Sequence, residues 1–301
     1  MSIAPNAARV YLPKLQNPPA TILEYLCHHF PQVAEEVWRA RVNAGKVSTN
    51  DAKIHCDTAY QHGITVAYFR ELEVEEKIPF QEDIIFENDH LLIADKPHFL
   101  PVTPAGQSVN ECLLYRLQMR TGISELAPLH RLDRDTAGLV LFSKVKAERR
   151  LYARLFAAHE VERTYMATAA MAGKTIPQEG DEWTVENRLA PGDPWFRMKV
   201  VAEASVNATT HIRFKKVGDG FGLFELHPQT GKKHQLRVHM MSIGFPIVND
   251  CFYPEVGFRD PGDYSNPLQL LASQIRFIDP IIGEPFLFKS NRALAGWQEQ
   301  T

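Results

Sequence analysis

The sequence has little net charge and little cysteine. Its 301 residues carry 33 Lys and Arg against 36 Asp and Glu, which gives a formal net charge of -3. A protein that attracts nucleic acid through its overall field is normally basic, so any contact with RNA or DNA must come from local patches. The four cysteines lie far apart and without clustered histidines, at Cys27, Cys56, Cys112 and Cys251. This spacing disfavours a zinc site or a disulfide framework and is typical of a reducing compartment.

Several kinds of segment are also missing. No run approaches the roughly 18 apolar residues that a membrane helix needs, and residues 1–20 lack the apolar stretch of a signal peptide. The absence of GxxxxGK(S/T) and GxGxxG argues against nucleotide triphosphates and dinucleotides. The absence of GxSxG, and of HxE with PCxxC, argues against a serine hydrolase and a zinc deaminase. We therefore expect a soluble, cytoplasmic protein that does not bind a membrane or a metal.

Composition divides the chain into four parts. Residues 1–20 hold four prolines and are predicted to form an arm, and residues 21–70 read as a small α/β module of helices and short strands. Residues 71–80 are acidic and include Pro79, which predicts a linker, although a solvated charged surface fits equally well. Residues 81–301 form the main domain.

The main domain mixes strand and helix patterns without repeated βαβ units. "DIIFENDHLLIADKP" shows two apolar runs around a polar turn, which predicts a hairpin. "NECLLYRLQMRTG" and "KAERRLYARLFAAHEV" read as helices, and "ERTYMATAAM" reads as a strand. We expect an α+β domain built on a mixed, mainly antiparallel sheet.

The stretch "LHRLDRDTAGLVLFSK", residues 129–144, places two aspartates ahead of an apolar run that reads as a buried strand. Asp133 and Asp135 each neighbour an arginine. A nearby guanidinium keeps a carboxylate ionised, which suits a nucleophile or an electrostatic stabiliser better than a general acid. The alternative is a loop aspartate that caps a turn or joins an exposed ion pair of little net energy.

Cations and aromatic residues gather in three further segments. In "HPQTGKKHQLRVHMM", a turn at Thr230 and Gly231 precedes several cations and the predicted start of a helix, a favourable place for phosphate. Arg150 and Arg154 are four apart on the predicted helix 146–161 and could follow an RNA backbone. "PWFRMK" combines aromatic rings with cations, as base stacking and phosphate contact require. Each segment could equally be an ordinary basic surface or a half-buried loop.

Together these segments resemble the RluA-type pseudouridine synthase family. "HRLDRDTAGLVLFSK" is similar to the family signature, "IIFENDHLLIADKP" to its opening hairpin, "VERTYMA" to its tyrosine strand, and "QTGKKHQLRVHMMSIGFPIVND" to its Thr-Gly-Arg-x-His-Gln segment. The likeness covers about residues 81–290 in order. It implies the pseudouridine synthase fold and the isomerisation of uridine to pseudouridine in structured ribosomal or transfer RNA. It also implies that no metal, ATP or redox cofactor is needed, and we expect a monomer.

The resemblance assigns roles by position. Asp133 matches the essential aspartate, Tyr165 the tyrosine that packs on the target base, and Arg237 the arginine that pairs with the aspartate. Asp135 matches a variable position and becomes a bystander. Arg131 matches an arginine that enters the RNA stack when the uridine leaves it. The other expected RNA contacts are Arg134, Arg150, Arg154, Arg197, Lys232, Lys233 and His234.

The likeness has limits. "WRARVNAGKVSTNDAKI" is similar in part to the alpha-L RNA-binding module, but Thr49-Asn50-Asp51 replaces the usual Val-Asn-Gly. Residues 21–70 could therefore bind RNA or be a structural appendage. The family's usual serine is Ala137 here, and its first arginine is Lys232, which loses bidentate phosphate geometry. The rival hypothesis is a catalytically silent RNA-binding or chaperone protein of the same fold, and retention of Asp133, Tyr165 and Arg237 argues against it.

Overall fold

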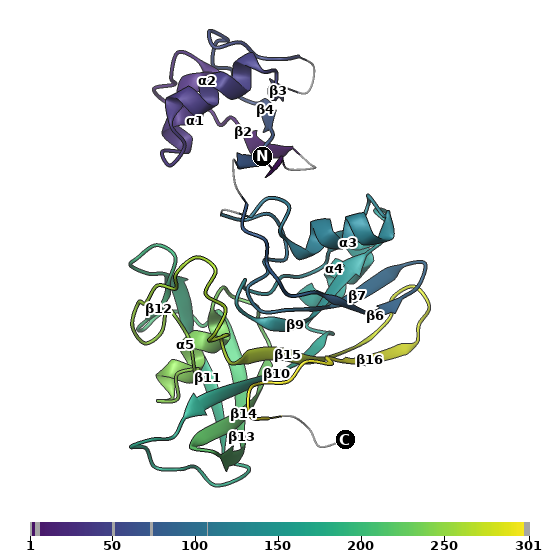
Figure 1. The fold of residues 1–301 in the computed structure, drawn as a ribbon, viewed down its shortest axis with the longest axis vertical. Coiled ribbons are helices and arrows are strands. Elements are labelled where there is room, and N and C mark those ends of the chain that lie inside the picture. Colours follow the sequence, from purple (N-terminus) through teal and green to yellow (C-terminus); the bar gives the residue numbers. More distant parts are fainter. Residues whose placement is uncertain (1, 4–6, 50–51, 73–74, 107, 298–301) are drawn as a thin grey trace. The chain divides into compact units, whose positions relative to one another are not determined.

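The computed structural model describes residues 2–3, 7–49, 52–72, 75–106 and 108–297. The chain forms two compact units, one of residues 1–75 with 104–110 and the other of residues 76–103 with 111–301 (Figure 1). The change of unit near residue 75 falls inside the acidic segment that we expected to link them. Residues 104–110, which we expected in the main domain, belong to the smaller unit.

The smaller unit packs two helices against a three-stranded sheet ordered β2-β4-β3. Thr21 caps α1, because its hydroxyl accepts a hydrogen bond from the backbone N–H of Glu24. Gly45 follows α2 with a positive φ of 68°, as expected of a residue that ends a helix. The elements are β1 (Ser2–Ile3), β2 (Ala8–Tyr11), α1 (Ile22–His29), α2 (Glu35–Asn43), β3 (Val47–Thr49), β4 (Thr65–Tyr68) and β5 (Glu71–Leu72).

The N-terminal arm expected over residues 1–20 differs from the structure. Residues 8–11 form β2, which pairs antiparallel with β4. Val10 and Leu12 lie buried in the core of the smaller unit. A strand of four residues among prolines carries too short an alternation to be recognised in the sequence. Asn50 and Asp51, on which the comparison with the alpha-L module partly rests, lie outside the described residues.

The larger unit contains one extended sheet of strands ordered β12-β11-β13-β14-β10-β15-β9-β7-β6 (Figure 1). Its pairs are antiparallel except that of β9 with β15, so the expected mixed, mainly antiparallel sheet is confirmed. The elements are β6 (Asp83–Glu87), β7 (Leu91–Lys96), α3 (Leu113–Thr121), β8 (Ala127–Pro128), β9 (Ala137–Ser143), α4 (Arg149–Ala157), β10 (Glu162–Ala170), β11 (Glu182–Pro191), β12 (Met198–Val201), β13 (Ala208–Gly218), β14 (Phe221–Pro228), α5 (Gln235–Ser242), β15 (Leu270–Ile278) and β16 (Pro285–Lys289).

Strand β9 is buried on both faces, which explains its unbroken apolar run. Val140 and Phe142 join the cluster that includes α3, whereas Leu139 and Leu141 join the cluster around Tyr152 of α4. A strand covered on both sides gains free energy from an apolar residue at every position. The loop that holds Asp133 is therefore anchored at its C-terminal end by a fully buried strand.

A close backbone contact sets the position of that loop. Gly138 has a φ of 113°, and a Cβ atom on it would lie 2.2 Å from the carbonyl oxygen of Ala272. Ala272 of β15 pairs with Gly138 on one side and with Tyr165 of β10 on the other. This one position of β15 thus brings the Asp133 loop next to the tyrosine strand.

Among the described residues, no helix has the length and apolar character to cross a membrane.

Candidate active site

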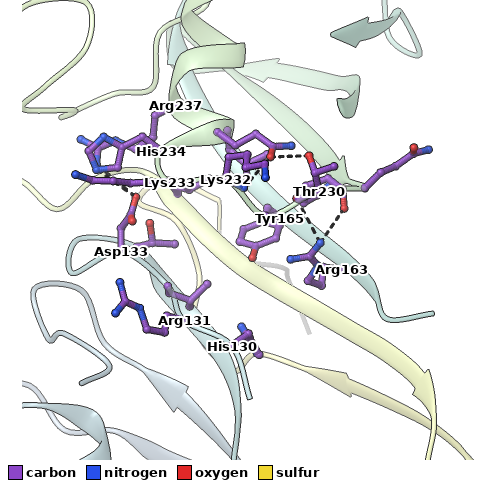
Figure 2. Close-up of a pocket in the computed structure, with 18 of the residues that line it drawn as sticks. His130, Arg131, Asp133, Arg163, Tyr165, Thr230, Lys232, Lys233, His234 and Arg237 are labelled. Atoms are coloured by element: carbon purple, nitrogen blue, oxygen red, sulfur yellow. Dashed lines mark hydrogen bonds and ion pairs between the residues drawn. The ribbon is translucent and has the colours of Figure 1, made fainter. Parts of the chain in front are cut away.

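A pocket of about 470 Å³ lies where the loop before β9, strand β10 and the turn before α5 meet (Figure 2). Asp133 and Thr136 line it from the loop, Tyr165 from β10, and Arg237 from α5. The side chains that the sequence placed in three separate segments therefore share one cavity.

Asp133 points from its loop toward α5 (Figure 2). Its carboxylate oxygen Oδ2 lies 3.5 Å from Nη1 of Arg237 and 3.9 Å from Nε2 of His234, and the side chain is 31% exposed. The backbone N–H of Thr136 donates to the carbonyl of Asp133 and closes the turn. The carboxylate is oriented by cationic and aromatic neighbours, yet it stays open to the pocket.

Arg237 is held chiefly by Asp250. Its Nε and Nη2 donate to the two oxygens of Asp250 at 2.7 and 2.5 Å, and the Arg237 side chain is only 2% exposed. Burial opposes the charge of Arg237, but the hydrogen bonds and charge of Asp250 outweigh burial and raise its pKa. This bidentate pair fixes the plane of the guanidinium and leaves Nη1 directed at Asp133. Sequence reasoning did not assign Asp250 a role, although it closes the matched segment.

His234 lies buried beside Asp133 in a left-handed conformation with a φ of 53°. Burial, together with the positive charges of Arg237 and Lys233, lowers its pKa to about 3. The imidazole is therefore neutral at physiological pH, and its Nδ1 lies 3.0 Å from the hydroxyl of Tyr253. In this position the ring shapes the wall of the pocket around the carboxylate.

The start of α5 differs from the sequence prediction. The cations after Gly231 were expected at the start of the helix, but Lys232 and Lys233 precede it, because α5 begins at Gln235. The side-chain oxygen of Gln235 accepts from the backbone N–H of Lys232 and from the hydroxyl of Thr230, and these bonds hold the turn. The two lysines consequently lie on the turn that lines the pocket.

Tyr165 supplies the flat face of the pocket. It is 7% exposed, and burial raises the pKa of its hydroxyl, which keeps the phenol protonated. Its place in the ladder between β14 and β15 makes the ring position rigid. Figure 2 shows the ring between Asp133 and Arg163. An apolar ring there offers a surface on which a planar base can pack.

Lys96, at the end of β7, fixes the Asp133 loop through a hydrogen bond to its backbone. Its ammonium is fully buried and donates to the carbonyls of Pro97, Leu100 and Arg134 at 2.9, 2.7 and 3.0 Å. Burial lowers its pKa to about 7. Because Arg134 follows Asp133 directly, the bond to its carbonyl fixes the backbone beside the carboxylate. In the sequence this residue was marked only as the end of a hairpin.

Asp135 has different partners from Asp133. Its carboxylate lies 3.7 Å from Nη1 of Arg259, and its carbonyl is 2.7 Å from Nδ1 of His98. It does not line the pocket. The two aspartates therefore have different surroundings and do not form a carboxylate pair.

Arg163 is a pocket residue that sequence reasoning missed. Its Nη2 donates to the carbonyls of Pro228 and Thr230 at 3.3 and 3.4 Å. Its Nε is buried and has no hydrogen-bond partner within the described residues. The signal available in the sequence was its position two residues before Tyr165, on the same face of β10.

The expected RNA contacts separate into two groups. Arg131, Lys232, Lys233 and His234 line the pocket, whereas Arg134, Arg150, Arg154 and Arg197 do not. The side chain of Arg134 donates to the carbonyl of Phe99, and that of Arg197 donates to the carbonyl of Pro254. Arg150 and Arg154 are exposed on α4. Within the described part of the chain, no cluster of three or more His, Cys, Asp or Glu side chains could hold a metal ion.

Comparisons with known proteins agree on one family. The model of the RNA pseudouridylate synthase family matches residues 90–242. The dual-specificity RNA pseudouridine synthase RluA of Yersinia pestis is 30% identical over 68% of this chain and 97% of its own length. The tRNA pseudouridine synthase C of Vibrio parahaemolyticus is 28% identical over 71% of this chain and 91% of its own. The structure of human RNA pseudouridylate synthase domain containing 1 has a TM-score of 0.55 and 22% identity, and covers 70% of this chain and 84% of that one.

Proposed function

Because this chain belongs to the RluA-type RNA pseudouridine synthases, isomerases that convert uridine in RNA to pseudouridine, we propose that Asp133 is the nucleophile of that reaction. The observation that carries the proposal is the partly exposed Asp133 carboxylate, directed by the buried pair of Arg237 and Asp250 into a pocket that faces Tyr165. A carboxylate that is oriented by a neighbouring guanidinium and open to the pocket is suited to attack or to stabilise positive charge.

The reaction needs only rearrangement within the nucleotide. The bond from ribose C1′ to base N1 breaks, the uracil rotates, and a bond from C1′ to C5 forms. The proton on C5 is then removed and N1, which carried none while bound to C1′, gains one, so the product is an isomer of the substrate. Asp133 would bond to C1′ as the bond to N1 breaks and be displaced when C5 bonds to C1′, or would bond to the base and be released again after the uracil has rotated. In either case Tyr165 packs on the ring and its hydroxyl relays the proton. Proposed in this way, the chemistry uses side chains alone and needs no metal.

The target uridine must leave the RNA stack to reach Asp133, as for other enzymes that act on a base. We assign Arg131, exposed at the pocket, to the space that the uridine vacates. Lys232, Lys233 and Arg163 surround the other side of the pocket and supply charge for the backbone phosphates. If so, RNA affinity should fall as the salt concentration rises. Lys232→Ala should reduce the slope of the logarithm of the binding constant against the logarithm of the salt concentration by about 1.

The substrate is proposed to be structured RNA of the transfer or ribosomal class. Transfer RNA is the first to test, because one relative is named for it. We expect the protein to act as a monomer in the cytoplasm. RNA binding by the smaller unit stays a prediction that rests on its partial likeness to the alpha-L module.

The decisive experiment compares the two aspartates of the loop. Purified protein is incubated with unmodified transfer and ribosomal RNA, and pseudouridine is measured after digestion to nucleosides. Asp133→Asn should form none while still binding RNA, and Asp135→Asn should remain active because it lies outside the pocket. Full activity of Asp133→Asn would overturn the assignment.

A further inference from the structure

We propose that Trp195, at the tip of the hairpin between β11 and β12, is a stacking platform for a nucleobase that neighbours the target uridine. The inference rests on the proposed function above, because it places the platform beside the pocket of Asp133. It adds a ligand site for an RNA base outside the catalytic pocket.

The indole of Trp195 is unusually exposed. It is 81% accessible, whereas Trp38 is fully buried. A tryptophan buries a large apolar area when it finds a partner, so leaving one in water forgoes much stabilisation. Exposure alone is common for single apolar residues. The surroundings of Trp195 are what distinguish it.

A continuous series of ring contacts joins Trp195 to the active site. Its ring meets Phe196 edge-on at 5.9 Å, and Phe196 contacts Phe252 at 5.0 Å between centroids. Phe252 in turn lies 5.6 Å from the ring of His234 and 4.9 Å from the guanidinium of Arg237. The last two residues are the neighbours of the Asp133 carboxylate. The exposed indole is therefore the outer end of an aromatic wall that begins at the pocket.

The hairpin tip is held in place rather than loose. The backbone N–H of Gly192 donates to the carbonyl of Arg197, and that of Arg197 donates to the carbonyl of Pro194. The Arg197 guanidinium lies 4.8 Å from the ring of Tyr253. The Tyr253 hydroxyl accepts from the backbone N–H of Met198 at 2.7 Å. A platform fixed before binding loses little entropy when a base stacks on it.

A cation links the platform to the pocket. Nζ of Lys233 lies 5.8 Å from the centre of the Trp195 ring, and Lys233 itself lines the pocket of Asp133. A strand that leaves the pocket past Lys233 meets the indole next. Aromatic faces beside a cationic track are how proteins bind single-stranded RNA, since every base has a flat face and every nucleotide a phosphate. An unstacked base beside the flipped uridine is the occupant that fits.

The first test separates binding from chemistry. Wild type, Trp195→Ala, Trp195→Tyr and Trp297→Phe are assayed on an unmodified transfer RNA transcript. Trp195→Ala should raise KM roughly 5- to 150-fold, the effect of losing one stacked base, with kcat unchanged. Trp195→Tyr should restore most of the loss because it keeps a ring. Trp297 also lies under a lysine, Lys216 at 5.3 Å, but it does not line the pocket, so Trp297→Phe should behave as wild type.

The second test observes the ring itself. With Asp133→Asn as background, the same transcript should quench tryptophan fluorescence. Adding Trp195→Tyr should remove most of that change, whereas adding Trp297→Phe should keep it. Suppose that wild type forms pseudouridine, that Trp195→Ala has the KM of wild type, and that the quenching persists without Trp195. The stacking role of Trp195 is then disproved, while the proposed function stands. If wild type forms no pseudouridine in any transfer or ribosomal RNA, the proposed function fails and the platform fails with it.

Discussion

Arg237 and Asp250 form a closed, bidentate ion pair, and Asp133 is only the third member of the group. The distances are 2.7 and 2.5 Å within the pair, against 3.5 Å from Arg237 to Asp133. Asp250 is fully buried and Asp133 is 31% exposed. The buried positive charge is therefore already balanced without Asp133. The carboxylate of Asp133 can enter a covalent bond without leaving an unpaired charge in the interior.

This arrangement predicts a large cost for Asp250→Asn. The amide oxygen can still accept from the backbone N–H groups of Phe252 and Tyr253, which Asp250 holds now. The substitution removes the charge and replaces Oδ2, which accepts from Nε of Arg237, by an NH2 group that cannot accept, so Arg237 is left buried with an incomplete partner. Breaking a buried pair in this way costs about 3–5 kcal/mol of unfolding free energy, measured by urea denaturation. Activity should fall with it, because the guanidinium is no longer held toward Asp133.

An exposed ion pair between strands β11 and β13 gives the control. Arg213 and Glu182 lie 2.7 Å apart with side chains 51% and 62% exposed. Glu182→Gln should change stability little, since water screens such a pair. Equal stability losses in Asp250→Asn and Glu182→Gln would contradict the role assigned to the buried pair.

Gly138→Ala should damage both the fold and the site. Its φ of 113° disfavours any L residue, and the added Cβ would meet the Ala272 carbonyl oxygen at 2.2 Å. The loss should exceed the roughly 1–2 kcal/mol of a left-handed residue alone. Gly122→Ala is the matched control, because its φ is 72° but nothing lies within 4 Å of its Cβ position. Similar melting temperatures for the two variants would show that the contact with β15 is not restrictive.

Acidification should destabilise the protein through buried histidines, and His239 allows a clean test. It is fully buried, and burial lowers its pKa from 6.5 to about 4. Its Nδ1 lies 2.9 Å from the Thr210 hydroxyl and its Nε2 lies 3.2 Å from Oδ1 of Asn187, which suits a neutral ring. Below pH 6.5 the unfolded chain binds a proton that the native state does not take up until about pH 4. By pH 5 this lowers the unfolding free energy by about 2 kcal/mol.

His239→Gln should therefore flatten the pH dependence. The variant loses some stability at pH 7, but its unfolding free energy should fall by about 2 kcal/mol less between pH 7 and pH 5 than that of wild type. Urea denaturation at the two pH values measures both. An identical slope would mean that His239 titrates alike in the native and unfolded states.

The sequence predicted those parts of the fold whose pattern is local. The β6–β7 hairpin, α3 with its end at Gly122, and the buried strand β9 follow from apolar periodicity and turn residues. Strands β11, β12, β15 and β16 were not predicted. Their exposed faces and neighbouring loops weaken the alternation, and long-range pairing rather than local pattern specifies them.

The residues of the candidate site were named where a motif marks them and overlooked where only tertiary packing brings them together. Asp133, Tyr165 and Arg237 were named from their segments, and the structure brings them together at one pocket. Asp250 and Lys96 act through partners distant in sequence, so no local pattern indicates their role. No local pattern indicates, either, how the loop is held in place when the family's usual serine is Ala137. Lys96 and Gly138 hold it through contacts that only the folded chain reveals.

The short ladder between β9 and β15 also matters for anyone who wishes to redirect this protein to another RNA. It joins Leu271 to Ala137 and Ala272 to Gly138, directly beneath the Asp133 loop. Substitutions there would change the separation between Asp133, the proposed nucleophile, and the ring of Tyr165, on which the target base is proposed to pack. The hairpin tip at residues 192–197 lies outside the catalytic pocket and presents its indole to solvent. Libraries for altered RNA choice should therefore vary the tip and leave the ladder untouched.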